Sequence, residues 1–308
     1  MKQAYLEPKK WIGRKQEIFN KIIEVVEDFE SQGYRMTLRQ LYYQLVSQDI
    51  IPNKDSEYKK LGSLLNDSRY YGFVDWDFIE DRVRVPKKNS EWDDIPDVVQ
   101  SAIHSYRRNR WQDQDNYLEV WVEKDALSGV LLPITQKYHV TLMVNRGYSS
   151  ASAMHDSALR FINQEDEGKE THILYLGDHD PSGIDMVHDI KNRMSIFGSD
   201  VIVDRIALNM NQIKRYNPPP NPAKITDPRA KDYIERFGNT SWELDALNPK
   251  QLNKLLDDEI QRLMDLDKYN YWCKLEQYEK IQLQQIAKTI NVEDMEIDNL
   301  PESEDEIC

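Results

Sequence analysis

The run THILYLGDHDPSG, residues 171–183, decides the fold of this sequence. Its first ten residues have the pattern of a strand that ends in two acids, and Ser182 and Gly183 then open a helix. In an open parallel sheet, active sites form at the carboxyl ends of the strands. The run therefore predicts a strand of such a sheet and a polar site at its end.

Similar strand-like runs lie on either side of it along the chain: YLEVWVE (117–123), VTLMVNRG (140–147) and DVIVDRIAL (200–208). Helical segments separate the strands, at 126–136, 149–164 and 183–196. Strands that alternate with helices predict an α/β fold, with a Rossmann-like parallel sheet and helices on its faces. A proline-rich, extended connection over 217–228 and further helices up to about residue 290 follow.

The N-terminal part has a different pattern. Helical patterns over 12–31, 37–47 and 56–71 precede an extended stretch over 73–85. Thr37 and Gln40 fit a capping box, in which each side chain satisfies a free backbone N–H at the start of the second helix. Three helices followed by a β-like wing predict a winged helix-turn-helix domain.

These patterns give a domain organisation. We expect a winged-helix domain over 1–86, a polar linker over 87–115, the sheet domain over 116–216, a mainly helical extension over 217–290 and an acidic, disordered tail over 291–308. The tail holds eight acids and no base, so it contributes much of the net charge of −14. Overall charge therefore neither supports nor excludes a nucleic-acid partner.

Composition excludes several classes of protein. Two cysteines cannot form a disulfide framework, and no Cys/His cluster suggests zinc. No apolar run approaches the roughly 18 to 20 residues that cross a bilayer. The N-terminus has no apolar segment typical of a signal peptide. We expect a cytoplasmic protein without a membrane partner, associated with the nucleoid in a bacterium or phage.

Three acids form the first candidate site. Glu123 ends the first strand of the sheet, and Asp178 and Asp180 end the third. Side chains at neighbouring strand ends can share one cation, since adjacent strands lie about 4.8 Å apart. Carboxylates without His or Cys ligands suit Mg²⁺. We therefore expect Glu123, Asp178 and Asp180 to bind Mg²⁺, with His179 as a neighbouring residue that does not bind the metal. A phosphatase with an aspartyl nucleophile is a weaker interpretation, because it leaves Glu123 unexplained.

A tyrosine forms the second candidate site. At about 100° per residue, Tyr42 falls on the apolar face of its helix, whereas Tyr43 and Arg39 fall together on the outer face. Tyrosine suits phosphodiester transfer because the phosphotyrosyl link conserves the bond energy and allows resealing. We therefore expect Tyr43 to be an accessible nucleophile and Arg39 to hold a phosphate beside it.

Further basic residues are candidates for DNA phosphate contacts: Arg69 on the third helix, and Arg82 and Arg84 on the wing. Ordinary surface charge is the alternative explanation for all of them.

Several motifs occur in the order found in a known family. TLRQLYY (37–43), VEKDAL (122–127), GYSSASAMHD (147–156) and GDHDPSGIDM (177–186) resemble the A subunit of topoisomerase VI and the related meiotic double-strand-break transesterase. RIALNMNQIKRY (205–216) and ELDAL (243–247) resemble the C-terminal portion of that family. The resemblance covers residues 35 to 265, approximately, and implies that the sheet domain is a Toprim domain.

By this resemblance, Tyr43 is the nucleophile, Arg39 and Glu123 complete the catalytic set, and Glu123, Asp178 and Asp180 bind Mg²⁺. In the family, the tyrosine of one protomer reacts at the metal site of the other. The resemblance therefore implies a homodimer that makes double-strand breaks in DNA with a 5′-phosphotyrosyl intermediate. The chain has no recognisable ATPase segment, so an ATPase partner subunit is either separate or absent. Its short length resembles a small, stand-alone member of the family.

Two alternatives remain open. The first is a Toprim nuclease that hydrolyses DNA with a metal-activated water and does not use the tyrosine. The second is a non-catalytic DNA-binding or regulatory protein whose acidic site is vestigial.

Overall fold

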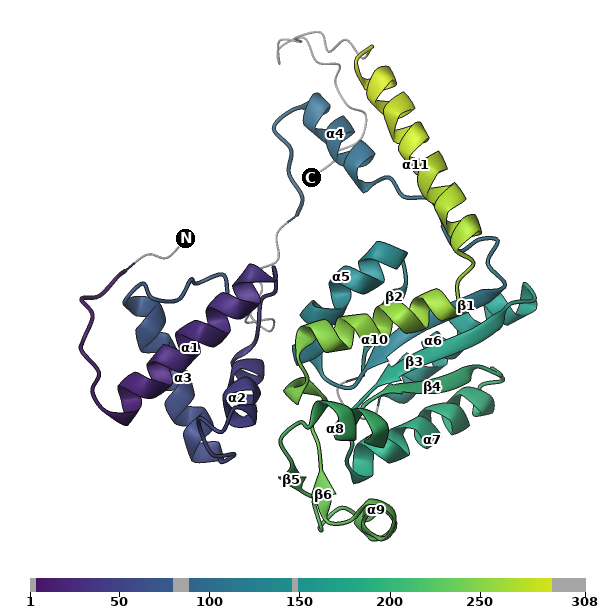
Figure 1. The fold of residues 1–308 in the computed structure, drawn as a ribbon. Helices are drawn as coiled ribbons and strands as arrows, with labels where there is room; N and C mark the ends of the chain where they lie inside the picture. The colour runs from purple at the N-terminus through teal and green to yellow at the C-terminus, as the bar shows by residue number, and fades with distance from the viewer. Residues whose placement is uncertain (1–3, 80–88, 146–148, 290–308) are drawn as a thin grey trace, which may run out of the picture. The chain divides into compact units, whose positions relative to one another are not determined.

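The computed structural model of the chain describes residues 4–79, 89–145 and 149–289 (Figure 1). The chain divides into two compact units. The larger unit draws on Met1–Val85 and Trp111–Leu266, and the smaller unit draws on Pro86–Arg110 and Asp267–Cys308. The N-terminal helices and the parallel sheet therefore belong to one unit, whereas residues 87–110 of the predicted linker belong to the other.

The N-terminal helices are α1 (Arg14–Ser31), α2 (Leu38–Ser47) and α3 (Asp55–Tyr70). Their buried apolar faces, with Ile22 and Leu41 completely inaccessible to solvent, form one hydrophobic cluster. The predicted capping box at the start of α2 is confirmed, with the Gln40 N–H donating to the Thr37 hydroxyl over 3.2 Å. These elements agree closely with the helices expected from the sequence.

The predicted wing is only partly described. Residues 73–79 form turns, and Ile79 makes an isolated parallel bridge with Met36. The rest of the predicted wing, including Arg82 and Arg84, lies outside the described residues. A winged-helix domain therefore stays a prediction.

The central sheet of the larger unit contains β1 (Asn116–Val122), β2 (Thr141–Val144), β3 (Glu170–Leu176) and β4 (Ile202–Ala207). The strand order is β2-β1-β3-β4, and all neighbours pair in parallel, which confirms the expected α/β sheet. After β1 the chain adds β2 on one side, and then β3 on the other. The strand order thus reverses between β1 and β3, and ligands of open α/β sheets bind at such a switch point.

Helices cover both faces of this sheet (Figure 1). One face packs on α6 (Ala151–Asp166) and α7 (Pro181–Ile196), where Trp121 and Tyr175 are completely buried. The other face packs on α5 (Ser128–Tyr138) and α10 (Pro249–Arg262). Shorter elements complete the unit: η1 (Asp125–Leu127), α8 (Met210–Tyr216), β5 (Asn221–Pro222), α9 (Ala230–Phe237), β6 (Thr240–Ser241) and η2 (Leu244–Ala246).

The smaller unit contains α4 (Ile95–Ser105) and most of α11 (Leu266–Ala287). Helix α4 lies within residues 87–115, which the sequence predicts as a polar linker. Asp94 caps α4 by accepting from the Asp97 N–H over 2.8 Å, and a proline follows in the first turn. In the part of the chain that the structure describes, no helix is both long enough and apolar enough to span a membrane.

Candidate functional site

Glu123 and Asp178 meet at the switch point of the sheet. Glu123 directly follows β1, and Asp178 lies two residues after β3. The Asp178 N–H donates to Glu123 Oε2 over 3.0 Å. Arg205, from β4, donates to the carbonyl oxygens of Gly177 and Asp178 over 3.0 Å and 2.5 Å. Parallel pairing and one half-buried arginine therefore fix the loop that carries Asp178.

The next residues of this loop turn tightly into α7. Oδ1 of Asp180 accepts from the Gly183 N–H over 2.6 Å and from the Ser182 hydroxyl over 3.0 Å, so Asp180 caps the helix. A Cβ atom on Gly183 would lie 2.1 Å from the carbonyl oxygen of Asp178, a distance that no side chain can adopt. Gly183 is therefore required for close packing of the loop.

A backbone bridge brings a distant segment to this loop. The His179 N–H donates to the Trp242 carbonyl over 2.8 Å, and the Trp242 N–H donates back over 3.0 Å. Oδ1 of Asp178 then accepts from the Leu244 N–H over 2.8 Å. These bonds place Glu243 and Asp245, on either side of Leu244, next to Asp178.

His179 has a structural environment. Its ring is 2% exposed and packs edge-on against Tyr233, Phe237 and Trp242. Burial, with a contribution from Arg205, lowers the pKa of His179 to about 4. The imidazole is therefore neutral near pH 7, and its Nδ1 lies 2.8 Å from the Tyr233 hydroxyl.

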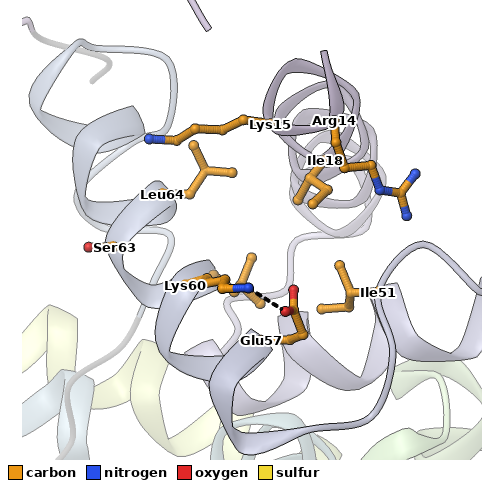
Figure 2. A pocket seen from close by; sticks show the side chains of 9 residues that line it. Arg14, Lys15, Ile18, Ile51, Glu57, Lys60, Ser63 and Leu64 are labelled. Carbon is orange, nitrogen blue, oxygen red and sulfur yellow. Dashed lines mark hydrogen bonds and ion pairs between the residues drawn. The ribbon is translucent and has the colours of Figure 1, made fainter. Parts of the chain in front are cut away.

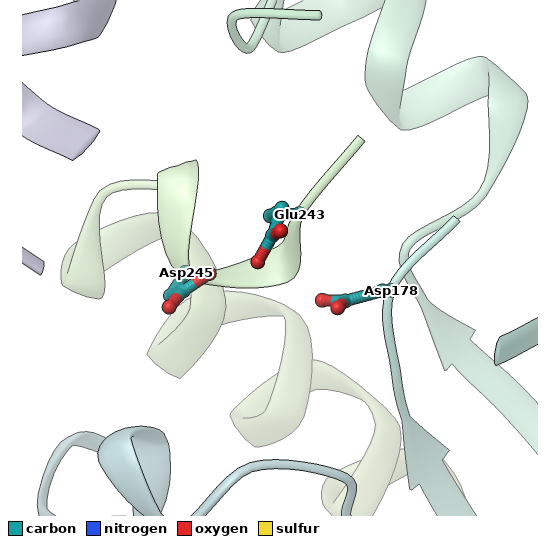
Figure 3. Close-up of side chains that lie close together, drawn as sticks. All are labelled: Asp178, Glu243 and Asp245. Carbon is teal, nitrogen blue, oxygen red and sulfur yellow. The ribbon is translucent and has the colours of Figure 1, made fainter. Parts of the chain in front are cut away.

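Asp178, Glu243 and Asp245 form the acidic triad (Figure 3). One carboxylate oxygen from each lies within 4.8 Å of the others, and Asp178 and Asp245 are buried. Asp178 projects from the loop after β3, and the other two come from the segment facing it (Figure 3). Glu123 and Asp180, which the sequence predicts as metal ligands with Asp178, belong to no such group of oxygens among the described residues.

Two basic side chains neutralise the acidic triad. Lys124 Nζ lies 2.6 Å from Asp178 Oδ2 and 3.4 Å from Asp245 Oδ1, and it also pairs with Glu243. Arg39 comes from α2 and donates to Glu243 over 2.8 Å and to Asp245 over 3.0 Å. Two cations thus face three carboxyl groups.

The pKa values reflect this arrangement. Burial by itself would lower the pKa of Lys124. The attraction of Asp178, Asp245 and Glu243 for the ammonium is larger than this effect, so the pKa of Lys124 is raised. Burial likewise opposes ionisation of Glu243, yet Lys124 and Arg39 lower its pKa to about 2. Burial raises the pKa of Asp178, although Lys124 opposes the shift. Lys124, Arg39 and Glu243 are therefore all charged near neutral pH.

Tyr43 lies against the same cluster. Arg39 Nη2 donates to the Tyr43 hydroxyl over 3.4 Å, a long hydrogen bond, and the guanidinium lies 5.5 Å from the centre of the ring. The prediction that Tyr43 is accessible is wrong, since its side chain is 6% exposed. The helical pattern of α2 could not anticipate this, because η2, from far along the chain, packs on α2. Burial and the nearby Glu243 raise the pKa of Tyr43.

Comparison with known proteins gives no family. No model of a known protein family matches this sequence. No curated protein matches it either. The resemblance to the A subunit of topoisomerase VI therefore rests on the quoted motifs alone, and the case for a function rests on the chemistry of the cluster around Arg39.

Arg69, predicted to contact DNA phosphates, packs against the turn that follows α3. Its guanidinium lies 4.3 Å from the centre of the Trp76 ring and donates to the Trp76 carbonyl over 2.8 Å. Burial lowers the pKa of Arg69. These contacts indicate that Arg69 holds the turn after α3, rather than pointing freely to solvent.

A cavity of about 400 Å³ lies between α1 and α3 (Figure 2). Its lining combines aliphatic side chains, among them Ile18 and Leu64, with the cations Arg14, Lys15 and Lys60. The Lys60 ammonium pairs with Glu57 over 2.7 Å, and both side chains appear at the edge of the cavity in Figure 2. No member of the acidic triad lines this cavity, so it is a separate feature.

No local sequence pattern pointed to Glu243, to Asp245 or to the ion pairs of Lys124. Glu243 and Asp245 stand only in the short motif ELDAL, and no spacing rule links them to a strand end 65 residues earlier. The capping role of Asp180 was predictable from the sequence, because an acid followed by proline is typical of a helix N-cap. A capping carboxylate has less freedom to bind a metal than one that projects from a strand end.

Proposed function

We propose that this protein cleaves double-stranded DNA by tyrosyl transesterification, as the resemblance to the A subunit of topoisomerase VI implies. The observation that carries the proposal is the position of Arg39. Its guanidinium bonds to the Tyr43 hydroxyl and also to two carboxylates of the acidic triad. The candidate nucleophile and the candidate metal ligands thus meet at one site.

The acidic triad fits a divalent metal of the Mg²⁺ type. Its donors are carboxylate oxygens within 4.8 Å of one another, with no nitrogen or sulfur ligand in the group. Mg²⁺ prefers such hard oxygen ligands and usually keeps several waters. Asp178, Glu243 and Asp245 would hold the ion, with Glu123 adjacent to Asp178. When bound, the ion would supply positive charge that stabilises the phosphate oxygens in the transition state.

The protein side chains have separate roles in this proposal. Tyr43 Oη attacks the phosphorus and forms the phosphotyrosyl bond, while the bond from phosphorus to the 3′ oxygen breaks. The tyrosine loses its proton, and the departing 3′ oxygen gains one. Arg39 orients the hydroxyl and opposes the rise in its pKa that burial and Glu243 cause. Its guanidinium is also suited to a phosphate, since its planar donors bind phosphate in pairs.

Tyr43 and the acidic triad belong to the same chain in this arrangement. The resemblance instead implies attack across a homodimer, with the tyrosine of one protomer at the metal site of the other. We keep the homodimer and a separate ATPase subunit in the proposal on the ground of the resemblance alone. DNA would also have to open the contact between α2 and η2, because the Tyr43 side chain is 6% exposed.

The burial of Tyr43 favours a second candidate function, hydrolysis of DNA by a metal-activated water at the acidic triad. A buried tyrosine whose pKa is raised is a poor nucleophile unless it is activated. Hydrolysis would need the carboxylates but not the tyrosine.

One experiment separates these possibilities. Supercoiled and end-labelled linear DNA are incubated with the protein and MgCl₂, stopped with SDS, and resolved with and without protease. Tyr43→Phe and Asp178→Asn are compared with wild type, and Tyr42→Phe is the matched control on the neighbouring residue. Breaks with protein attached to 5′ ends, lost in Tyr43→Phe and Asp178→Asn but not in Tyr42→Phe, support transesterification.

The other outcomes are equally informative. Protein-free breaks that survive Tyr43→Phe but disappear in Asp178→Asn support the hydrolytic nuclease. DNA binding without breaks in MgCl₂ contradicts both catalytic proposals and favours a DNA-binding protein.

A further inference from the structure

Lys124 lies among all three members of the acidic triad. Its Nζ is 2.6 Å from Asp178 and 3.4 Å from Asp245, and it also pairs with Glu243. Its side chain is 20% exposed, and that of Asp245 is completely buried. The ammonium is therefore held inside the cluster and is not a solvated surface charge.

A cation at this position is required for the cluster to exist. Buried carboxylates repel one another, and each loses hydration that only a nearby positive charge replaces. The Arg39 guanidinium pairs with Glu243 over 2.8 Å and with Asp245 over 3.0 Å. Lys124 contacts all three carboxylates, so it supplies the central positive charge.

A divalent metal would need the same oxygens. Mg²⁺ binds carboxylate oxygens at about 2.0–2.1 Å, so a shared ion would lie between the three side chains. The Lys124 ammonium already lies there, and two cations so close would repel each other strongly. Occupation of the acidic triad by metal and by Lys124 is therefore mutually exclusive.

We propose that Lys124 is the resident counter-ion of the acidic triad and that a divalent metal binds by displacing it. This inference rests on the proposed function, because it assumes that the acidic triad is the metal site. The flexible four-carbon stem of lysine allows the ammonium to leave without movement of β1. Once displaced, the ammonium would stay at the rim of the site, where it is suited to pair with a phosphate group.

The test measures metal binding by the full-length protein without DNA. Mn²⁺ titrations, followed by electron paramagnetic resonance of the free ion, compare wild type with Lys124→Met. Lys137→Met is the matched control. Lys137 Nζ lies 2.9 Å from Asp257 Oδ1, and this ion pair includes no member of the acidic triad. We expect Lys124→Met to bind Mn²⁺ at least about tenfold more tightly than wild type, which corresponds to about 1.4 kcal/mol. Lys137→Met should bind as wild type does.

Thermal unfolding provides a second measurement. Without metal, Lys124→Met should melt below wild type, because its carboxylates lack their counter-ion. Mn²⁺ should raise the melting temperature of Lys124→Met more than that of wild type, since binding to the folded state alone stabilises it. Lys124→Arg keeps a cation at the position, so it should fold and bind Mn²⁺ no more tightly than wild type.

The measurements separate a failure of the Lys124 displacement from a failure of the metal site itself. Equal Mn²⁺ affinity in wild type and Lys124→Met, or tighter binding by Lys124→Arg than by wild type, overturns the displacement of Lys124 but leaves the metal site intact. Absence of Mn²⁺ binding in wild type and both Lys124 variants overturns the metal site itself, and with it the proposed function. If Lys124→Met folds only in the presence of Mn²⁺, the metal replaces the ammonium, as the proposal requires.

Discussion

Arg39 donates to Asp245 over 3.0 Å, although 206 positions separate the two residues in the sequence. This ion pair joins the second N-terminal helix to the segment that carries two members of the acidic triad. Asp245 is completely buried, so its carboxylate depends on Arg39 and Lys124 for compensation. The contact therefore links the stability of the larger unit to the geometry of its candidate site.

Arg39→Met should lower the free energy of unfolding by about 1–3 kcal/mol, since it removes charged donors from a buried acceptor. The Arg39 side chain itself is 45% exposed, so water screens its charge. The loss in stability therefore comes from the carboxylate partners that no longer receive its hydrogen bonds. Urea denaturation measures the change. Arg35→Met, on the exposed residue just before α2, is the control and should change the value by less than about 0.5 kcal/mol. Equal losses in both variants would contradict a specific role for Arg39.

Glu119→Ala should destabilise the larger unit by about 3–5 kcal/mol, because removal of one partner leaves a buried network unpaired. Glu119 is completely buried and accepts from Arg160 Nε over 2.8 Å, from the Tyr117 hydroxyl over 2.9 Å and from Trp121 Nε1 over 2.9 Å. Equilibrium denaturation followed by tryptophan fluorescence provides the measurement. Glu259→Ala removes an exposed ion pair instead and should cost at most about 1 kcal/mol.

Gly183→Ala should distort the loop that carries Asp178. The new Cβ would lie 2.1 Å from the Asp178 carbonyl oxygen, a backbone atom that cannot move aside alone. We expect a loss of several kcal/mol in stability, by analogy with overpacked cores that cost about 1–3 kcal/mol or more. Gly62→Ala is the control, since its nearest neighbour is a Leu38 side-chain carbon at 3.2 Å. A folded Gly183→Ala protein with wild-type thermal stability would contradict the steric requirement for glycine at this position.

Glu276→Gln tests the pH dependence of the smaller unit. Burial opposes ionisation of Glu276, but the bonds from Arg110, the Arg108 N–H and Lys280 lower its pKa to about 2. Because the pKa of Glu276 is lower in the folded protein than in the unfolded protein, ionisation of its carboxyl group stabilises the fold. This stabilisation is complete above the pKa of the unfolded protein, about 4.3, and is lost as the pH falls towards 2. Wild type should therefore exceed Glu276→Gln in stability at pH 7, and this difference should shrink between pH 4.5 and pH 2.

Thermal unfolding followed by circular dichroism checks this expectation at a series of pH values. Glu279→Gln is a useful comparison, because Glu279 accepts from Arg108 Nε over 2.7 Å but is more exposed. A difference between wild type and Glu276→Gln that stays constant down to pH 2 would exclude Glu276 as the titrating group.

Local sequence patterns were enough to predict the order of strands and helices and the parallel sheet. The runs at 117–123 and 171–180 are apolar over the length of a strand, and burial of such runs between helices requires a parallel sheet. The capping box at Thr37 was also predictable, because capping depends on residues within one helical turn. The position of Asp178 at a strand end followed from the same local patterns.

The side chains that meet Asp178 and the burial of Tyr43 depend instead on contacts between segments far apart in the chain. The bridge between His179 and Trp242 brings Glu243 to the site, and no local pattern encodes a pairing across so many residues. Helical periodicity shows which face of α2 is apolar, but it cannot show that η2 covers the polar face as well. Local interactions fix the elements, whereas burial and ion pairing between distant segments fix the site.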